Sequence, residues 1–99
     1  MEIRIQSIHF TADNKLEEFT TSKVEKLVQF NDKIIHADVY LKFDSASHQV
    51  KDKTAEIKLN VPGTTLFSSE TAKTFEEAID SAVESLRRQI KKHKTKIGN

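Results

Sequence analysis

The feature that most limits the fold is a change in the spacing of apolar residues along the chain. In segments 35–43 and 55–61, apolar residues occupy every odd position and more polar residues stand between them. Successive side chains of a β-strand point to opposite faces, so this alternation predicts two strands with one buried face each. In segments of about 14–29 and 75–94, apolar residues recur every three to five positions, which is typical of amphipathic helices.

Shorter signals complete the order of the elements. Apolar and polar residues also alternate at 3–5, which predicts a short first strand. Pro62-Gly63 favours a tight turn, because proline fixes φ at the first position and glycine tolerates positive φ at the second. A two-residue loop there places Leu59 opposite Leu66, both on the buried face of a hairpin.

Capping residues stand before both predicted helices. Asp13 or Asn14 can cap the first helix, since Asn14 is followed three places later by Glu17. Thr74 and Glu77 have the spacing of a capping box at the start of the second helix.

Together these elements predict an α+β domain with the order β-α-β-β-β-α. Every element has one apolar face, so a four-stranded mixed sheet with both helices packed on one side buries all of them. The first helix forms a right-handed crossover between two parallel strands, and the other strands form an antiparallel meander. We expect one domain over residues 1–99, with a polar loop at 44–52 and a tail that is free to be disordered from about residue 95.

Composition argues against several classes of function. The chain has no cysteine and begins without a signal peptide or a membrane-spanning run, so we expect a cytoplasmic protein. It lacks a glycine-rich phosphate-binding loop, and no Ser or Asp stands in a motif typical of a catalytic nucleophile. The four histidines, which have no metal-ligand spacing, are His9, His36, His48 and His93. We therefore expect no catalytic residues, no metal, no cofactor and no small-molecule substrate.

Charge is distributed very unevenly. Residues 1–86 hold 10 Lys and Arg against 15 Asp and Glu, whereas residues 87–99 hold 6 basic residues and no acidic ones. The helix dipole favours cations at a helix C-terminus, and this effect explains about half of the six basic residues. Six cations so close together repel one another unless an anion binds, so this segment is a candidate site for a polyanion.

The cations of the second helix fall on both sides of its apolar stripe. Arg87, Lys91 and Lys94 lie on one flank and Arg88, Lys92 and Lys96 on the other. His93 continues the stripe, and it is either partly packed structure or an RNA contact. In the first helix Lys23 stands in an apolar row with Lys26 nearby, so both can face the cationic end of the second helix across a furrow suited to phosphates.

The order and spacing of several motifs resemble the ribosome hibernation promoting factor and ribosome-associated inhibitor family, also known as sigma-54 modulation proteins or protein Y. The most specific are Ala78-Ile79-Asp80 and the ending Leu86-Arg87-Arg88-Gln89-Ile90-Lys91-Lys92-His93-Lys94-Thr95-Lys96. Ile3-Arg4-Ile5, Leu16-Glu17-Glu18-Phe19 and Lys23-Val24-Glu25-Lys26-Leu27 support them. The resemblance covers nearly the whole chain and is to the short form, which lacks the additional domain of long members.

The resemblance implies a non-enzymatic, monomeric protein that binds the small ribosomal subunit and inhibits translation. Members carry both helices on one face of the sheet, as double-stranded-RNA-binding domains do, and contact ribosomal RNA in the channel of messenger and tRNA. By position Lys23, Lys26, Arg88 and Lys92 match the basic sites of the family best, with Lys94 and Lys96 next. Arg87 and Lys91 add charge that not every member has, and ribosomal proteins are further possible contacts.

One departure and two rival functions accompany this resemblance. Thr74-Phe75-Glu76 stands where the family usually has Asp-Met-Tyr, so any contact of that tyrosine is in doubt. A general double-stranded-RNA module is one rival, although such modules carry lysines where this chain has Glu76 and Glu77. The other rival is an interaction domain whose cationic end meets an acidic protein.

Overall fold

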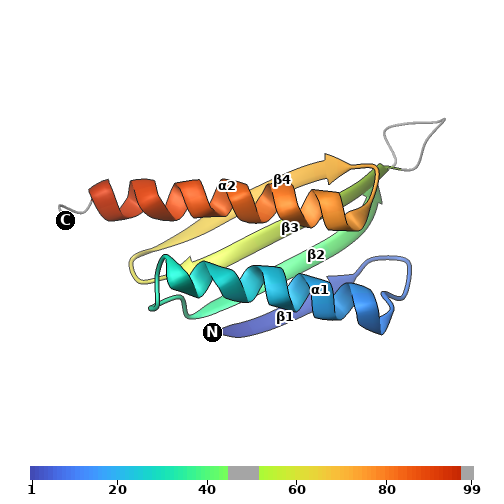
Figure 1. Cartoon of the computed structure of the whole chain (residues 1–99), viewed down its shortest axis with the longest axis horizontal. Helices are drawn as coiled ribbons and strands as arrows, with labels where there is room; N and C mark the ends of the chain where they lie inside the picture. The colour runs from blue at the N-terminus through green and yellow to red at the C-terminus, as the bar shows by residue number, and fades with distance from the viewer. Residues whose placement is uncertain (45–51, 97–99) are drawn as a thin grey trace.

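The computed structural model describes residues 1–44 and 52–96, without the side chains of residues 94–96. Its elements follow the predicted order (Figure 1). They are β1 (Glu2–Ser7), α1 (Asn14–Glu25), a short 3-10 helix η1 (Lys26–Gln29), β2 (His36–Asp44), β3 (Asp52–Val61), β4 (Thr64–Ala72) and α2 (Phe75–Lys96). The interior of the predicted polar loop, 45–51, lies outside the described residues. Of the predicted tail, α2 includes residues 95 and 96, and 97–99 lie outside the described residues.

The four strands form one mixed sheet in the order β1-β2-β3-β4. β1 runs parallel to β2, with Ile3 beside Ala37, and α1 lies in the connection between them. β2, β3 and β4 form an antiparallel meander, and Leu59 pairs with Leu66 as the turn predicted. Gly63 in that turn has a φ of +89°, a conformation that residues with a Cβ adopt much less readily. The predicted fold class and topology are therefore confirmed.

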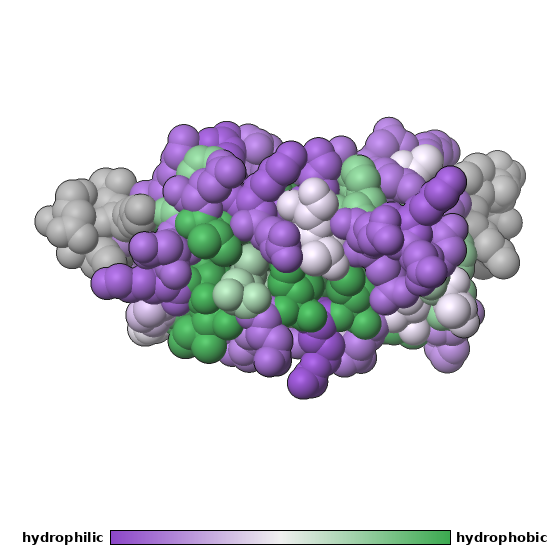
Figure 2. Space-filling view, turned by 60° about the horizontal axis from the view of Figure 1, so that its bottom comes forward, coloured by the Kyte–Doolittle hydropathy of each residue, from purple (hydrophilic) through white to green (hydrophobic). Residues whose placement is uncertain are grey.

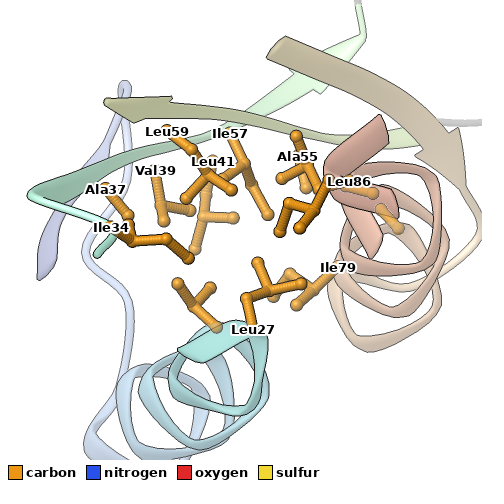
Figure 3. Packing of buried hydrophobic residues seen from close by; sticks show 14 of the residues in the cluster. Leu27, Ile34, Ala37, Val39, Leu41, Ala55, Ile57, Leu59, Ile79 and Leu86 are labelled. Atoms are coloured by element: carbon orange, nitrogen blue, oxygen red, sulfur yellow. The ribbon is translucent and has the colours of Figure 1, made fainter. Parts of the chain in front are cut away.

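Both helices lie on the same face of the sheet and run in the same direction (Figure 1). Odd-numbered side chains of β2 and β3 pack against apolar side chains of the helical layer, including Leu27 of η1 and Ile79 and Leu86 of α2 (Figure 3). Val39 and Ile57 are fully buried in this layer. Burying one such side chain contributes roughly 1.5–3 kcal/mol, so the cluster fixes the helices relative to the sheet.

β1, at one edge of the sheet, is covered less completely than the central strands. Ile3 and Ile5 are half-buried, whereas Ala37 and Val39 of the neighbouring strand are fully buried. Seen from the side of α1 and β1, a row of apolar surface borders the hydrophilic surface (Figure 2). The core therefore thins toward this edge, and its most buried part lies between β2, β3 and the two helices.

The first helical segment is not one continuous α-helix. It is α-helical to Glu25 and continues as a 3-10 helix, whereas the apolar spacing predicted a single helix over about 14–29. In a 3-10 helix residues three apart lie on the same side. The Phe30 N–H donates to the Leu27 carbonyl at 3.0 Å, and both side chains pack against the core. The tighter winding thus turns Phe30 toward the core.

Side-chain caps begin both helices. Asp13 caps α1, and its Oδ1 accepts a hydrogen bond from the Leu16 N–H at 2.8 Å; Asn14 is the first residue of the helix. At α2, Thr74 Oγ1 accepts from the Glu77 N–H at 3.1 Å and donates to Glu77 Oε1 at 3.0 Å. The predicted pairing of Thr74 with Glu77 is confirmed, and the structure selects Asp13 at the first helix.

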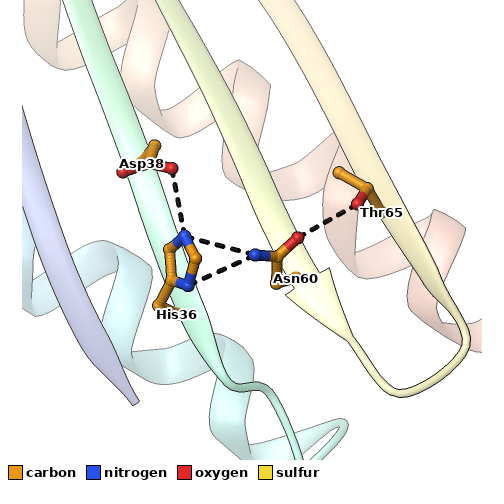
Figure 4. A network of polar contacts seen from close by, with 4 residues as sticks. All are labelled: His36, Asp38, Asn60 and Thr65. Atoms are coloured by element: carbon orange, nitrogen blue, oxygen red, sulfur yellow. Dashed lines mark hydrogen bonds and ion pairs between the residues drawn. The ribbon is translucent and has the colours of Figure 1, made fainter.

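A polar network spans three strands on the sheet face that the helices leave open (Figure 4). His36 Nε2 lies 3.1 Å from Asp38 Oδ2, and both ring nitrogens lie 3.2 Å from Asn60 Nδ2. Thr65 Oγ1 donates to Asn60 Oδ1 at 3.0 Å. The network joins β2, β3 and β4 beside the β3–β4 turn, and it gives His36 a structural role.

Candidate nucleic-acid interface

The cationic half of α2 presents its side chains on two flanks of the buried stripe. Leu86 and Ile90 point into the core with no more than 1% of their surface exposed. One flank, which we call the α1 flank, carries Arg87 and Lys91 toward Phe30. The other, which we call the β4 flank, carries Arg88 and Lys92, as the predicted helical arrangement requires.

The α1 flank is stabilised by contacts within the protein. Arg87 Nε donates to Glu84 Oε2 at 2.9 Å, and a second guanidinium nitrogen donates to Glu84 Oε1. The guanidinium carbon of Arg87 lies 5.9 Å from the centre of the Phe30 ring, and Lys91 Nζ lies 5.7 Å from it. A cation over an aromatic face at this distance is attracted to it, so Phe30 helps to hold both side chains.

Glu84 also reduces the charge of this region. The hydrogen bond from Arg87 lowers the pKa of the Glu84 carboxyl group, and the charges of Arg87, Arg88 and Lys91 act in the same direction. The same hydrogen bond raises the pKa of Arg87. Glu84 Oε1 lies 3.6 Å from Arg88 Nη1. The sequence segment 87–99 contains no acid, but one from the preceding turn reaches two of its cations.

Lys23 does not converge with the cationic end of α2. Its Nζ lies 3.2 Å from Asp80 Oδ1 and 5.4 Å from the centre of the Phe19 ring, and 34% of its side chain is exposed. Asp80 precedes Arg87 by seven residues, or about 10 Å along the helix. Lys23 therefore lies in the groove between the helices, as predicted, but is paired there with a carboxylate. Among the described side chains, Lys23 and the cations of α2 do not form the continuous furrow expected from the sequence, because the two helices pack so that Lys23 lies level with Asp80 and not with Arg87.

The β4 flank borders a groove. Gln89 Nε2 donates to the Phe67 carbonyl of β4 at 2.8 Å and lies 3.2 Å from Ser85 Oγ. Beside this bridge is an open hollow of about 1030 Å³. It is lined by Thr64, Leu66, Ser85, Arg88, Gln89, Lys91, Lys92 and His93. We call this hollow the α2–β4 groove, and it brings half-buried His93 together with three of the candidate cations.

The remaining candidate cations are either exposed without an ion-pair partner in the described part of the chain or have side chains that the structure does not describe. Lys26 and Lys92 are exposed, and among the described residues neither has a carboxylate oxygen within 4.0 Å of its ammonium group. The side chains of Lys94 and Lys96 are not among those described. Six of the eight candidates have described side chains: two lie on each flank of α2, Lys23 lies in the groove between the helices, and Lys26 is exposed on η1.

Sequence reasoning missed several residues that shape this surface. Gln89 and Ser85 lie on the β4 flank at helical spacing from Arg88 and Lys92, so the helical pattern could have included them. Leu66 joins the groove only through the hairpin register and the placement of α2. Nothing local in the sequence connects Leu66 with α2.

Two other kinds of site lack support within residues 1–44 and 52–96. No group of three or more His, Asp or Glu side chains there is arranged to hold a metal ion. His9, His36 and His93 lie in separate parts of the fold, and His48 falls outside the described residues. In the same part of the chain, no helix has the length and apolarity that crossing a bilayer requires.

The fold and the cationic helix define a class of small α+β domain, in which two parallel helices cover one face of a four-stranded mixed sheet. The model of the family described as Sigma 54 modulation protein / S30EA ribosomal protein matches residues 3–98. The chain belongs to this family, which confirms the resemblance seen in its motifs.

Relatives match nearly the whole chain. Ribosome hibernation promoting factor of Escherichia coli strain K12 is 32% identical over 97 residues, covering 98% of this chain and 97% of that protein. Ribosome hibernation promoting factor of Pseudomonas putida is 27% identical over 96 residues, covering 97% of this chain and 89% of that protein.

Two solved structures share the fold. The N-terminal domain of Thermus thermophilus Protein Y superimposes with a TM-score of 0.82 at 24% identity, covering 94% of this chain and 99% of that chain. A ribosomal subunit interface protein from Coxiella burnetii gives a TM-score of 0.85 at 18% identity, covering 96% of this chain and 99% of that chain.

Proposed function

We propose that this protein is a ribosome-binding hibernation factor that occupies the messenger and tRNA channel of the small subunit and inhibits translation. The observation that carries the proposal is the cationic half of α2, in a chain that relatives named ribosome hibernation promoting factor match over nearly their whole length. Its partners are ribosomal RNA and, at the edges of the site, ribosomal proteins. It acts as a monomer in the cytoplasm, without a membrane, cofactor, metal or small-molecule substrate.

The mechanism is occlusion rather than catalysis. Cations of α2 and Lys26 of η1 bind phosphates, which supplies affinity without reading the base sequence. Folded RNA is recognised largely through its shape, so the rigid sheet and helix layer restricts binding to a cleft of matching form. While the domain is bound, messenger and tRNA cannot enter the same space.

A general double-stranded-RNA module remains the second candidate. Glu76 and Glu77 lie exposed in the first turn of α2, where such a module would place lysines. Comparing binding to plain duplex RNA and to purified small subunits separates the two functions. An acidic protein partner is the third candidate, and it would be favoured if co-sedimentation with ribosomes survived ribonuclease treatment.

The deciding experiment is co-sedimentation with ribosomes from resting cells. Arg88→Glu combined with Lys92→Glu should abolish binding, because two exposed cations become anions. Lys15→Glu combined with Lys73→Glu is the matched control: it changes the net charge equally at exposed sites where the helices begin. Folding of each variant is checked by circular dichroism. Unchanged binding of the folded Arg88/Lys92 variant would remove these residues from the site.

A further inference from the structure

The α2–β4 groove has features that phosphate binding alone does not require. Leu66 contributes an apolar side chain to its lining, and His93 adds a half-buried imidazole ring. Arg88 and Lys92 supply cations from the β4 flank, and Lys91, which contacts Phe30 on the α1 flank, also borders the hollow. Figure 1 shows the C-terminal half of α2 passing beside the β3–β4 turn, where β4 begins. A flat aromatic ring attached to a phosphate group fits this combination.

The groove is also large and held in shape. Its volume of about 1030 Å³ slightly exceeds the roughly 300–1,000 Å³ found for small-ligand pockets, so it has room for a nucleotide. The hydrogen bond from Gln89 to the Phe67 carbonyl ties α2 to β4 at the groove wall, and the contact of Gln89 with Ser85 lies within α2. Little reorganisation is therefore needed when a ligand enters, which favours binding.

We propose that the α2–β4 groove binds an unpaired, unstacked nucleotide from a single-stranded stretch of RNA. This inference rests on the proposed function and deepens it by naming the form of RNA that the β4 flank takes. The base lies over Leu66 and against the His93 ring, and the adjoining phosphates contact Arg88 and Lys92. Proteins commonly bind splayed RNA bases by stacking them on aromatic side chains or Arg guanidinium planes.

Duplex RNA does not use the groove in this way. Its bases are paired and stacked inside the helix, so they cannot cover Leu66, and only its phosphates can reach the cations. The β4 flank should consequently prefer a single strand to a duplex of equal charge. A site made only of exposed lysines would show no such preference.

The test measures anisotropy of fluorescently labelled RNAs with the full chain at low salt. The probes are a single-stranded octanucleotide and a GC-rich duplex of eight base pairs, whose larger charge makes a preference for the single strand a stricter test, and unlabelled AMP serves as competitor. Thr64→Glu places a carboxylate at the groove, where exposed Thr64 is a lining residue. Thr65→Glu is the matched control: the same exchange one residue along β4, on the open face of the sheet.

We expect the octanucleotide to bind at least 10-fold more tightly than the duplex. Thr64→Glu should weaken it about 10-fold, and Thr65→Glu less than twofold. Equal effects of the two variants, or equal binding of duplex and single strand, would overturn the proposal. If AMP displaced the labelled probe at the same concentration as unlabelled octanucleotide does, the groove would bind a free nucleotide. That result would overturn the assignment to RNA.

Ribosome binding is measured separately for the same variants. If wild-type protein sediments with ribosomes but binds the duplex as tightly as the single strand, the groove proposal alone is refuted. Failure of wild-type protein to sediment with ribosomes refutes the proposed function, whatever the short RNAs show.

Discussion

Arg88 and Lys92 should account for a measurable part of the salt dependence of ribosome binding. Each phosphate that a cation neutralises contributes about 0.7–0.9 to the negative slope of log affinity against log salt. Replacing both residues by glutamine removes two contacts, so the slope should become less negative by about 1.4–1.8. Raising salt from about 50 to 200 mM would then weaken wild-type binding about 7- to 12-fold more than variant binding.

The contrasting variant is Lys23→Gln. Its ammonium group is already paired with Asp80 at 3.2 Å, so its removal should leave the slope nearly unchanged. The assay is quantitative co-sedimentation with purified small subunits at four or more salt concentrations. An unaltered slope in the Arg88/Lys92 variant would refute phosphate contact by the β4 flank. If the slope of Lys23→Gln were less negative than that of the wild type by about 0.7–0.9, RNA would displace Asp80 from Lys23. That result would refute the separation of Lys23 from the RNA site.

Three further predictions concern stability and titration. Leu86→Ala should lower the free energy of unfolding by about 2–5 kcal/mol in urea titrations, because Leu86 is fully buried; no loss would contradict its central place in the core. Thr74→Ala should cost about 1 kcal/mol in the same assay by removing the α2 cap. In Arg87→Gln the pKa of Glu84, followed by carboxyl NMR, should rise toward its usual value. Since the folded-state pKa of Glu84 is lowered, the stability advantage of the wild type should shrink as pH falls through it.

Much of the fold could be predicted because its signals are local. The alternation in β2 and β3 reports a sheet with one buried face, and the turn at Gly63 sets the register that pairs Leu59 with Leu66. The 3-10 segment η1 could not be predicted in the same way. It depends on packing Phe30 against a core whose shape is set by the sheet and α2.

For the candidate site, too, local features could be predicted from the sequence and long-range contacts could not. The sequence located the cations and their two flanks on α2, because helical spacing fixes the direction of each side chain. It could not show that Lys23 faces Asp80, since this pairing depends on how far α1 is displaced along α2. It also could not show that Leu66 lines a groove beside Arg88 and Lys92.

The sequence by itself determined the order of elements, the buried face of each and the concentration of positive charge near the C-terminus. These follow from periodicity and charge, which act between neighbours in the chain. Only the tertiary structure decided which cations are satisfied within the protein and which line a groove. That outcome depends on distances between side chains far apart in sequence, and these are set by the packing of both helices on the sheet.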